Sequence, residues 1–362
     1  MPPDRRLERL ARLRERLGAA GLDRLLVTHL PNIRYLTGFT GTAGFLVLGP
    51  ERAVLITDFR YEAQAERESG AAVTVTIERA NTWDRLGRVL KESGAGPLGV
   101  EASVMTARDL RRVQGLVADP VQTTDDLVEG LRVAKDAGEV EAIRLAAVLA
   151  QEALAAVLPA IAPGQRELDV AAELERALRI RGSEWHPFPT IVASGPRSAL
   201  PHARTTDRVI QPGEWLLLDF GAQVSGYCAD LTRTVVVGRR ADARQREVYE
   251  VVRQAQLRAR AGVRAGQRGR DADLLARSVI AEAGFGEAFG HSLGHGLGLE
   301  VHEAPRLSPT SDLPIPAGAV VTIEPGIYLP GWGGVRLEDD LLVTPGGPDL
   351  LSDGRTELVE LV

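Results

Sequence analysis

Apolar positions in the first third of the chain switch between helical and strand spacing. Leu7, Leu10, Leu13 and Leu17 recur on one helix face, which predicts a helix over residues 5–20. Strand-like runs lie at 25–28, 44–48, 53–57, 73–77 and 98–101, and helical patterns lie at 83–93 and 106–116. Strands that alternate with helices predict an α/β domain with a partly parallel sheet.

The pattern changes near residues 131–138. One long helical pattern covers 131–154, and others lie at 167–181, 243–263 and 270–283, interleaved with strand hairpins. This arrangement predicts an α+β domain around an antiparallel sheet. We therefore expect two domains, 1–133 and 134–362, as the length of 362 residues also favours. No short tandem repeat is visible.

Composition and charge narrow the class of protein. The chain is 44% hydrophobic and 25% charged, as ordinary soluble proteins are. Its net charge of −6 argues against a nucleic-acid partner. Its one cysteine, Cys228, excludes an intramolecular disulfide. The charged first residues do not resemble a secretory signal, and no apolar run reaches the ~18 residues of a membrane helix. We expect a cytoplasmic protein with no membrane partner.

The basic residues are almost all arginines. Of the 43 lysines and arginines, only Lys91 and Lys135 are lysines. Selection for bidentate contacts to anions would favour arginine. Codon bias in a GC-rich genome is the simpler explanation for the whole set.

Two aspartates flank the turn of a predicted hairpin. Residues 216–220 and 228–237 have strand patterns, and 223–226 is the predicted turn. Asp219 and Asp230 can fall on one face as a cross-strand pair, which is destabilising unless something positive lies between them. A solvated face is the alternative, but the flanking runs WLLL and TVVV are too apolar for it.

Three of the six histidines lie in the segment HSLGHGLGLEVHE, residues 291–303. They are His291, His295 and His302, and the glycines between them allow a close backbone approach to a ligand. Neutral imidazole is a common ligand of transition metals. A lone buried histidine is usually hydrogen-bonded core, but three in a glycine-rich loop are poorly explained that way.

Glutamates, a histidine and an arginine complete the candidate set. Glu324 ends a predicted strand in AVVTIEPGIY. Arg336 and Glu338 are two residues apart on a predicted strand over 333–343, so the guanidinium can hold the carboxylate; a surface ion pair is the alternative. His202 lies in the loop ASGPRSALPHA.

The four acidic residues together predict a metal site. Carboxylates buried in one pocket would become neutral without cations to balance them. Two divalent cations balance four carboxylates, which points to a two-metal hydrolytic site.

The order Asp, Asp, His, Glu, Glu, within GYCADLTRT, HSLGHGLGLEVHE, IEPGIY and VRLEDD, resembles the pita-bread metallopeptidases, and among them the Xaa-Pro peptidases prolidase and aminopeptidase P. NIRYLTGFTGTAG and LITDFRY are similar to the N-terminal domain of that family, which methionine aminopeptidases lack. Creatinase has this layout without the metal ligands. The resemblance implies a creatinase-like α/β domain followed by a pita-bread α+β catalytic domain.

The resemblance also implies a ligand set. Asp219 would chelate one metal, Asp230 and Glu338 would bridge both, and His295 and Glu324 would complete the other. Two Mn²⁺ ions are implied, with Co²⁺ and Zn²⁺ as alternatives. A hydroxide bridging the metals would be the nucleophile, and Glu324 would shuttle its proton.

Further residues would act around the metals. The resemblance implies that His202 and His302 contact the substrate, His302 at the tetrahedral oxyanion, that His291 lines the proline side, and that Arg336 supports the ligands.

The implied substrate is a dipeptide or short peptide with proline at the second position. Whether dipeptides are preferred is open, because the group that would read their carboxylate is open among Arg197, Arg34, Arg60 and others. We also expect a homodimer. The alternative function is a non-enzymatic binding module, against which the intact ligand set argues.

Overall fold

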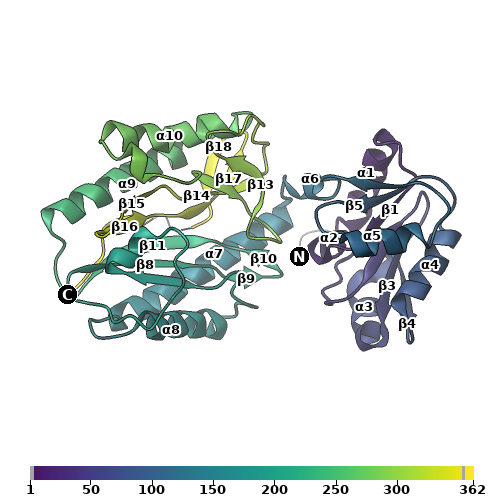
Figure 1. The fold of residues 1–362 in the computed structure, drawn as a ribbon, viewed down its shortest axis with the longest axis horizontal. Coiled ribbons are helices and arrows are strands. Elements are labelled where there is room, and N and C mark those ends of the chain that lie inside the picture. Colours follow the sequence, from purple (N-terminus) through teal and green to yellow (C-terminus); the bar gives the residue numbers. More distant parts are fainter. Residues whose placement is uncertain (1–3, 353–354) are drawn as a thin grey trace. The chain divides into compact units, whose positions relative to one another are not determined.

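The computed structural model describes residues 4–352 and 355–362, and the chain divides between Arg132 and Val133 into two compact units. The N-terminal unit contains a six-stranded sheet in the order β4-β3-β2-β1-β5-β6 (Figure 1). Strands β1 and β5 are parallel, as are β5 and β6 and also β3 and β4, whereas β2 is antiparallel to both of its neighbours. The strands are β1 (Arg24–Val27), β2 (Phe45–Leu48), β3 (Ala53–Asp58), β4 (Thr74–Glu78), β5 (Leu98–Glu101) and β6 (Val121–Thr124). The predicted α/β domain with a partly parallel sheet is confirmed.

The helices of this unit include two that the hydrophobic pattern did not predict. These are α2 (Leu30–Thr37) and α3 (Glu62–Ser69), of eight residues each. Strand β6 was also missed because its sequence, VQTT, has no apolar run. The other helices are α1 (Arg6–Ala19), α4 (Thr82–Glu92), α5 (Ala107–Gln114) and α6 (Glu129–Arg132), with 3₁₀ turns η1 (Phe59–Tyr61) and η2 (Gly70–Ala72).

The C-terminal unit has two larger sheets, whose strand pairs are antiparallel except for β11 with β19. Their orders are β19-β11-β8-β7 and β13-β12-β14-β17-β18. A backbone bridge between Thr232 and Glu338 joins them. The strands are β7 (Ile191–Ser194), β8 (Glu214–Phe220), β11 (Leu231–Val237), β12 (Gly294–Gly296), β13 (Glu303–Leu307), β14 (Val320–Ile323), β17 (Asp339–Thr344), β18 (Gly347–Leu350) and β19 (Glu360–Leu361). The predicted antiparallel α+β domain is confirmed.

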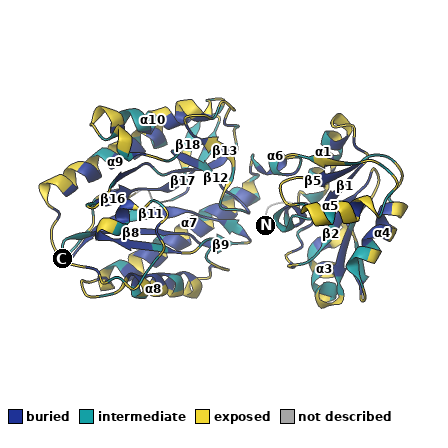
Figure 2. Ribbon diagram, in the orientation of Figure 1, coloured by how far each residue is buried: buried dark blue, intermediate teal, exposed yellow. Residues whose placement is uncertain are grey.

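Two helix pairs cover these sheets on opposite sides (Figure 1). The helices are α7 (Ala137–Val157), α8 (Glu167–Ile180), α9 (Ala243–Gly262) and α10 (Gly269–Glu282), with 3₁₀ turns η3 (Leu158–Ala160), η4 (Gly195–Ala199) and η5 (Gly286–Ala288). Exposed residues gather on the outer faces of the helices, and the strands between them are largely buried (Figure 2). One hydrophobic cluster centres on α7, α8, β8 and β11, and a second centres on α9, α10, β14 and β17.

Most residues of the two clusters come from two halves that repeat one backbone pattern, here called the first half (residues 137–238) and the second half (residues 243–350). Gly164 and Gln165 exchange hydrogen bonds with Ile210 at 2.9 Å each. Gly266 and Gln267 exchange the same bonds with Ile315 at 2.8 Å each. The amino-acid sequence does not reveal this correspondence, because the two segments share little more than the residues GQR.

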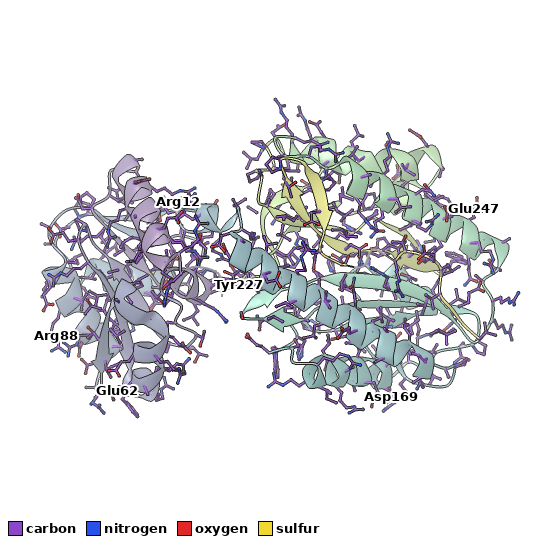
Figure 3. All side chains as sticks on the ribbon, turned by 180° about the vertical axis from the view of Figure 1, so that it is seen from behind. Arg12, Glu62, Arg88, Asp169, Tyr227 and Glu247 are labelled. Atoms are coloured by element: carbon purple, nitrogen blue, oxygen red, sulfur yellow. The ribbon has the colours of Figure 1, made fainter. Side chains whose placement is uncertain are left out.

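Helix α7 starts later than its hydrophobic pattern predicts. Asp136 caps it, since its Oδ1 accepts hydrogen bonds from the Gly138 and Glu139 N–H groups at 2.9 and 3.1 Å. Residues 133–136 are therefore outside the helix, and the predicted start at 131 is wrong. Tyr227, labelled in Figure 3, donates to Glu139 at 2.8 Å and ties a hairpin to this helix.

Residues 137–160, which include α7, form the one stretch of the described chain that is long and apolar enough to cross a membrane. Half of the most apolar 18-residue segment within this stretch is buried in the protein. Ala146, Ala150 and Ala153 are fully buried in the first cluster, as expected of a core helix.

Candidate metal centre

The first two candidate ligands lie on the hairpin of β8 and β11. Thr232 is the direct partner of Asp219, and Asp230 precedes Thr232 by two residues. The two carboxylates therefore share one face, as expected of a cross-strand pair, and lie diagonally rather than directly opposite each other. The turn is also tighter than predicted: the short strands β9 (Gln223–Val224) and β10 (Tyr227–Cys228) pair, which leaves only Ser225 and Gly226, both with positive φ, between them.

Glu338 lies between two strands rather than within one. Strand β16 (Gly333–Arg336) pairs with β15 (Gly326–Leu329), whereas β17 pairs with β14, so the predicted single strand over 333–343 is wrong. The Glu338 N–H donates to the Thr232 carbonyl at 3.1 Å. The Thr232 hydroxyl donates to Glu338 Oε2 at 2.6 Å. Thr232, which the sequence analysis did not select, thus fixes Glu338 through both backbone and side chain.

Arg336 binds Asp219 rather than its predicted partner Glu338. Its Nη2 donates to Asp219 Oδ2, and its Nε donates to the Thr232 hydroxyl at 3.0 Å. Its hydrogen bonds reach Glu338 only through the Thr232 hydroxyl, whereas its positive charge acts on the Glu338 pKa directly and lowers it, against the larger effect of burial. The guanidinium is buried and supports both carboxylates at once.

His295 on β12 has one ring nitrogen free to bind a metal. Its Nδ1 lies 3.1 Å from the Gly296 carbonyl, which places the proton on Nδ1 and leaves the Nε2 lone pair available. Nε2 is 3.5 Å from Glu324 Oε1 and 3.9 Å from Asp230 Oδ2. One donor atom from each of Asp230, His295 and Glu338 can be chosen so that all lie within 4.8 Å of one another.

Burial and mutual repulsion disfavour the charged forms of these carboxylates. Burial, followed by repulsion from Glu338, raises the pKa of Asp230 and that of Glu324 well above their usual values. Burial and then Asp219 raise the pKa of Glu338 to about 7. Burial also lowers the pKa of His295 to about 4, so its imidazole is neutral at pH 7.

The donor set fits divalent cations. Asp230 Oδ1 is buried and has no hydrogen-bond partner among the described residues, so it is available to a cation. Carboxylate oxygens and one neutral imidazole suit Mn²⁺, Co²⁺ or Zn²⁺. Cations would also remove the repulsion that raises the carboxylate pKa values.

Two of the remaining histidines lie at the rim of this cluster. The His302 ring centroid is 4.4 Å from that of His295, and the residue is exposed. His202 is also exposed, and its charge acts on the pKa of Asp219 and of His302. Both side chains are therefore exposed to solvent.

His291 lies deeper and contacts a residue that the sequence analysis missed. Its Nε2 is 2.9 Å from the Tyr328 hydroxyl, and Arg336 Nη1 donates to that hydroxyl at 2.8 Å. Burial, followed by the Arg336 charge, lowers the pKa of His291 to about 4. No local pattern marks Tyr328, because one partner, Arg336, lies on β16 and the other, His291, lies in the loop before β12.

Among the arginines considered for the substrate carboxylate, Arg197 already has a partner. Its Nε donates to both oxygens of Glu167 at 3.2 Å, and Glu167 is fully buried. The same carboxylate accepts the N–H groups of Ser194 and Thr206 at 2.8 and 3.1 Å. Arg197 therefore helps to fix the loop that carries His202. Arg60 pairs with Asp58, and Arg34 is half-buried on α2, both in the N-terminal unit.

Comparisons with known proteins agree with this fold. Residues 141–345 match the model of metallopeptidase family M24, and residues 9–134 match the creatinase/prolidase N-terminal domain. An Xaa-Pro dipeptidase from Pyrococcus horikoshii is 36% identical over 97% of this chain and 99% of its own length.

Two solved structures are similar over nearly their whole length. An Xaa-Pro dipeptidase from Bacillus anthracis has a TM-score of 0.95 at 42% identity and covers 98% of this chain and 100% of its own. An X-Pro aminopeptidase from Thermotoga maritima has a TM-score of 0.89 at 36% identity and covers 97% and 99%. The predicted metallopeptidase class is thus confirmed: the chain belongs to metallopeptidase family M24, with a creatinase/prolidase N-terminal domain followed by a pita-bread catalytic domain.

Proposed function

We propose that this chain is a dinuclear metal-dependent peptidase that hydrolyses the Xaa-Pro bond at the N-terminus of dipeptides or short peptides. The observation that carries the proposal is the convergence of Asp230, Glu338 and Glu324 around the His295 imidazole. Asp219 lies on the same face of the β8–β11 hairpin as Asp230. The names of the similar proteins, Xaa-Pro dipeptidase and X-Pro aminopeptidase, support the substrate class.

Five residues are proposed to hold the two cations. Asp230 and Glu338 would bind both, Asp219 one, and His295 and Glu324 the other. When bound, two divalent cations acidify water and polarise the scissile carbonyl. Mn²⁺ is the proposed metal, with Co²⁺ and Zn²⁺ as alternatives, because a site rich in carboxylates discriminates poorly among them.

The protein's own groups are proposed to move protons and orient the peptide. Glu324 follows β14 and keeps 16% of its side chain exposed, so it can accept a proton inside the site and release it outward. His302, beside His295, would donate to the oxygen on which negative charge develops. His202 would hold the peptide at the rim, and His291 would line the proline side.

The chemistry of the site suits this substrate. An Xaa-Pro bond is a tertiary amide without an N–H group, so recognition through that group is not available. The cationic α-amine of the substrate complements a pocket rich in carboxylates. Arg336, held between Asp219 and Tyr328, would keep the ligand carboxylates in place as the peptide enters.

The test is hydrolysis of Ala-Pro and Ala-Pro-Ala with added Mn²⁺, Co²⁺ or Zn²⁺ and with EDTA. We expect cleavage of at least one peptide, abolished by EDTA and by Asp230→Ala, but retained in Asp312→Ala, which removes an exposed aspartate. The rate ratio would decide between dipeptide and longer-peptide preference. Absence of cleavage under every metal would refute the proposal and favour a binding module.

We also propose a homodimer in the cytoplasm. Cys228 is free and buried, so the fold does not require an oxidising compartment. A sedimentation mass near 38.9 kDa, that of one chain, would contradict the dimer.

A further inference from the structure

One of the two lysines is buried against a carboxylate. Lys135 Nζ is 3.0 Å from Glu303 Oε2, and the two side chains are 1% and 7% exposed. Lys91, the other lysine, is exposed on α4. In a chain that otherwise uses arginine, the buried position holds the residue with a compact ammonium in place of a planar fork. Codon bias alone does not explain a lysine here.

The backbone on both sides of Lys135 is fixed. Its N–H donates to the Gly318 carbonyl at 2.8 Å, and Ala134 forms a bridge with Ala319. The helix cap at Asp136 follows directly. The ammonium is therefore anchored between the start of α7 and the segment leading into β14.

Glu303 fills the inside of a tight turn, residues 298–303. Its Oε1 accepts the Glu300 N–H at 3.1 Å. A Cβ at Gly298 would lie 2.7 and 2.8 Å from the two carboxylate oxygens, so only glycine leaves room for them. The Gly298 carbonyl accepts the Cys228 N–H at 2.8 Å, which joins the turn to the ligand hairpin.

We propose that Lys135 is a positioning residue: it holds the Glu303 carboxylate and thereby fixes the turn that places His302 beside His295. His302 immediately precedes Glu303, so its ring position depends on the conformation of this turn. The catalytic consequence rests on the proposed function, whereas the fixing of the turn does not.

The first experiment measures hydrogen–deuterium exchange in metal-free Lys135→Met, in Lys135→Met/Glu303→Gln and in the control Lys91→Met. The double variant matters because the single one takes the lysine charge away from a buried carboxylate, while glutamine removes that carboxylate charge and keeps the acceptor for Glu300. We expect exchange within residues 298–304 to be about 10-fold faster in both Lys135 variants and unchanged in the control. Unaltered exchange in the turn would overturn the proposal.

The second experiment separates positioning from general damage. On Ala-Pro-Ala with Mn²⁺, Lys135→Met should lower kcat by about 10- to 100-fold with little change in KM or bound metal. In a His302→Ala background the same substitution should cause no further loss. An equal loss in both backgrounds would refute the role. If the wild-type protein cleaves no Xaa-Pro peptide, the proposed function fails, and the exchange result alone decides the role of Lys135.

Discussion

The Thr232 hydroxyl forms hydrogen bonds with both Arg336 and Glu338, and the substitution Thr232→Val tests what these two bonds contribute. Valine has nearly the same shape but cannot donate to Glu338 or accept from Arg336 Nε, and the site is fully buried. Each hydrogen bond to a charged group contributes about 1.5–3 kcal/mol, so the loss of both costs at most about 6 kcal/mol of unfolding free energy.

The effect on metal binding should exceed the effect of instability alone. The Thr232 hydrogen bond lowers the pKa of Glu338, against the larger effects of burial and Asp219. Its loss would let a proton compete better with the cation, and removal of such a supporting partner typically costs about 10- to 100-fold in metal affinity.

Thr234→Val is the matched control. Thr234 lies two residues further along β11 and is as well buried, but its hydroxyl exchanges hydrogen bonds with the Arg336 backbone at 3.0 and 3.2 Å. It should cost about 1–3 kcal/mol and leave affinity for Mn²⁺ unchanged. Calorimetric titration of the metal-free proteins with Mn²⁺, beside thermal unfolding, measures both quantities. Equal metal affinity in the two variants would refute the reasoning.

Three further outcomes follow from the structure. Arg197→Ala should destabilise the fold by about 1–3 kcal/mol, which is less than the loss of a fully buried ion pair would cost because Arg197 is partly exposed. The ratio of the Ala-Pro and Ala-Pro-Ala cleavage rates should stay the same; a changed ratio would make Arg197 a substrate contact. In EDTA, the contribution of Glu338 to the free energy of unfolding should be complete below about pH 4.5 and lost as the pH rises through about 7. The reason is that the Glu338 carboxyl holds its proton more tightly in the folded state than in the unfolded state. Thermal melts at a series of pH values that show no such decline would contradict this. Gly221→Ala should reduce bound metal measured by atomic absorption, because its Cβ would lie 2.2 Å from the Ala229 carbonyl oxygen and force the hairpin to shift; full metal content would show that the hairpin tolerates it.

Local periodicity predicted the long helices well. Helices α8 and α9 begin at the residues expected and end within one residue of them, because their apolar faces are continuous. Periodicity did not predict element ends that depend on one residue. Asp136 caps α7 and so places its start at Ala137, and strand β16 ends at Arg336. A strand pattern alone does not reveal such a break.

The contacts that position the site residues could not be predicted from the sequence. Thr232 and Lys135 contact partners that are distant in the chain, and Tyr328 contacts a neighbouring strand; none of the three belongs to a pattern of metal ligands. The candidate ligands themselves were visible because acidic residues in apolar segments are costly and few. Their pairing was not visible, since it depends on register between strands and on where each strand ends.

The candidate ligands also divide between the two halves of the catalytic domain. Asp219 and Asp230 come from the first half, and His295, Glu324 and Glu338 come from the second. Each half supplies most of one hydrophobic cluster, and the candidate ligands come from segments of both halves. A cation bound to ligands from both halves would hold the two halves together. Two separately expressed fragments, divided near residue 240, should therefore bind each other more tightly when Mn²⁺ is present than in EDTA.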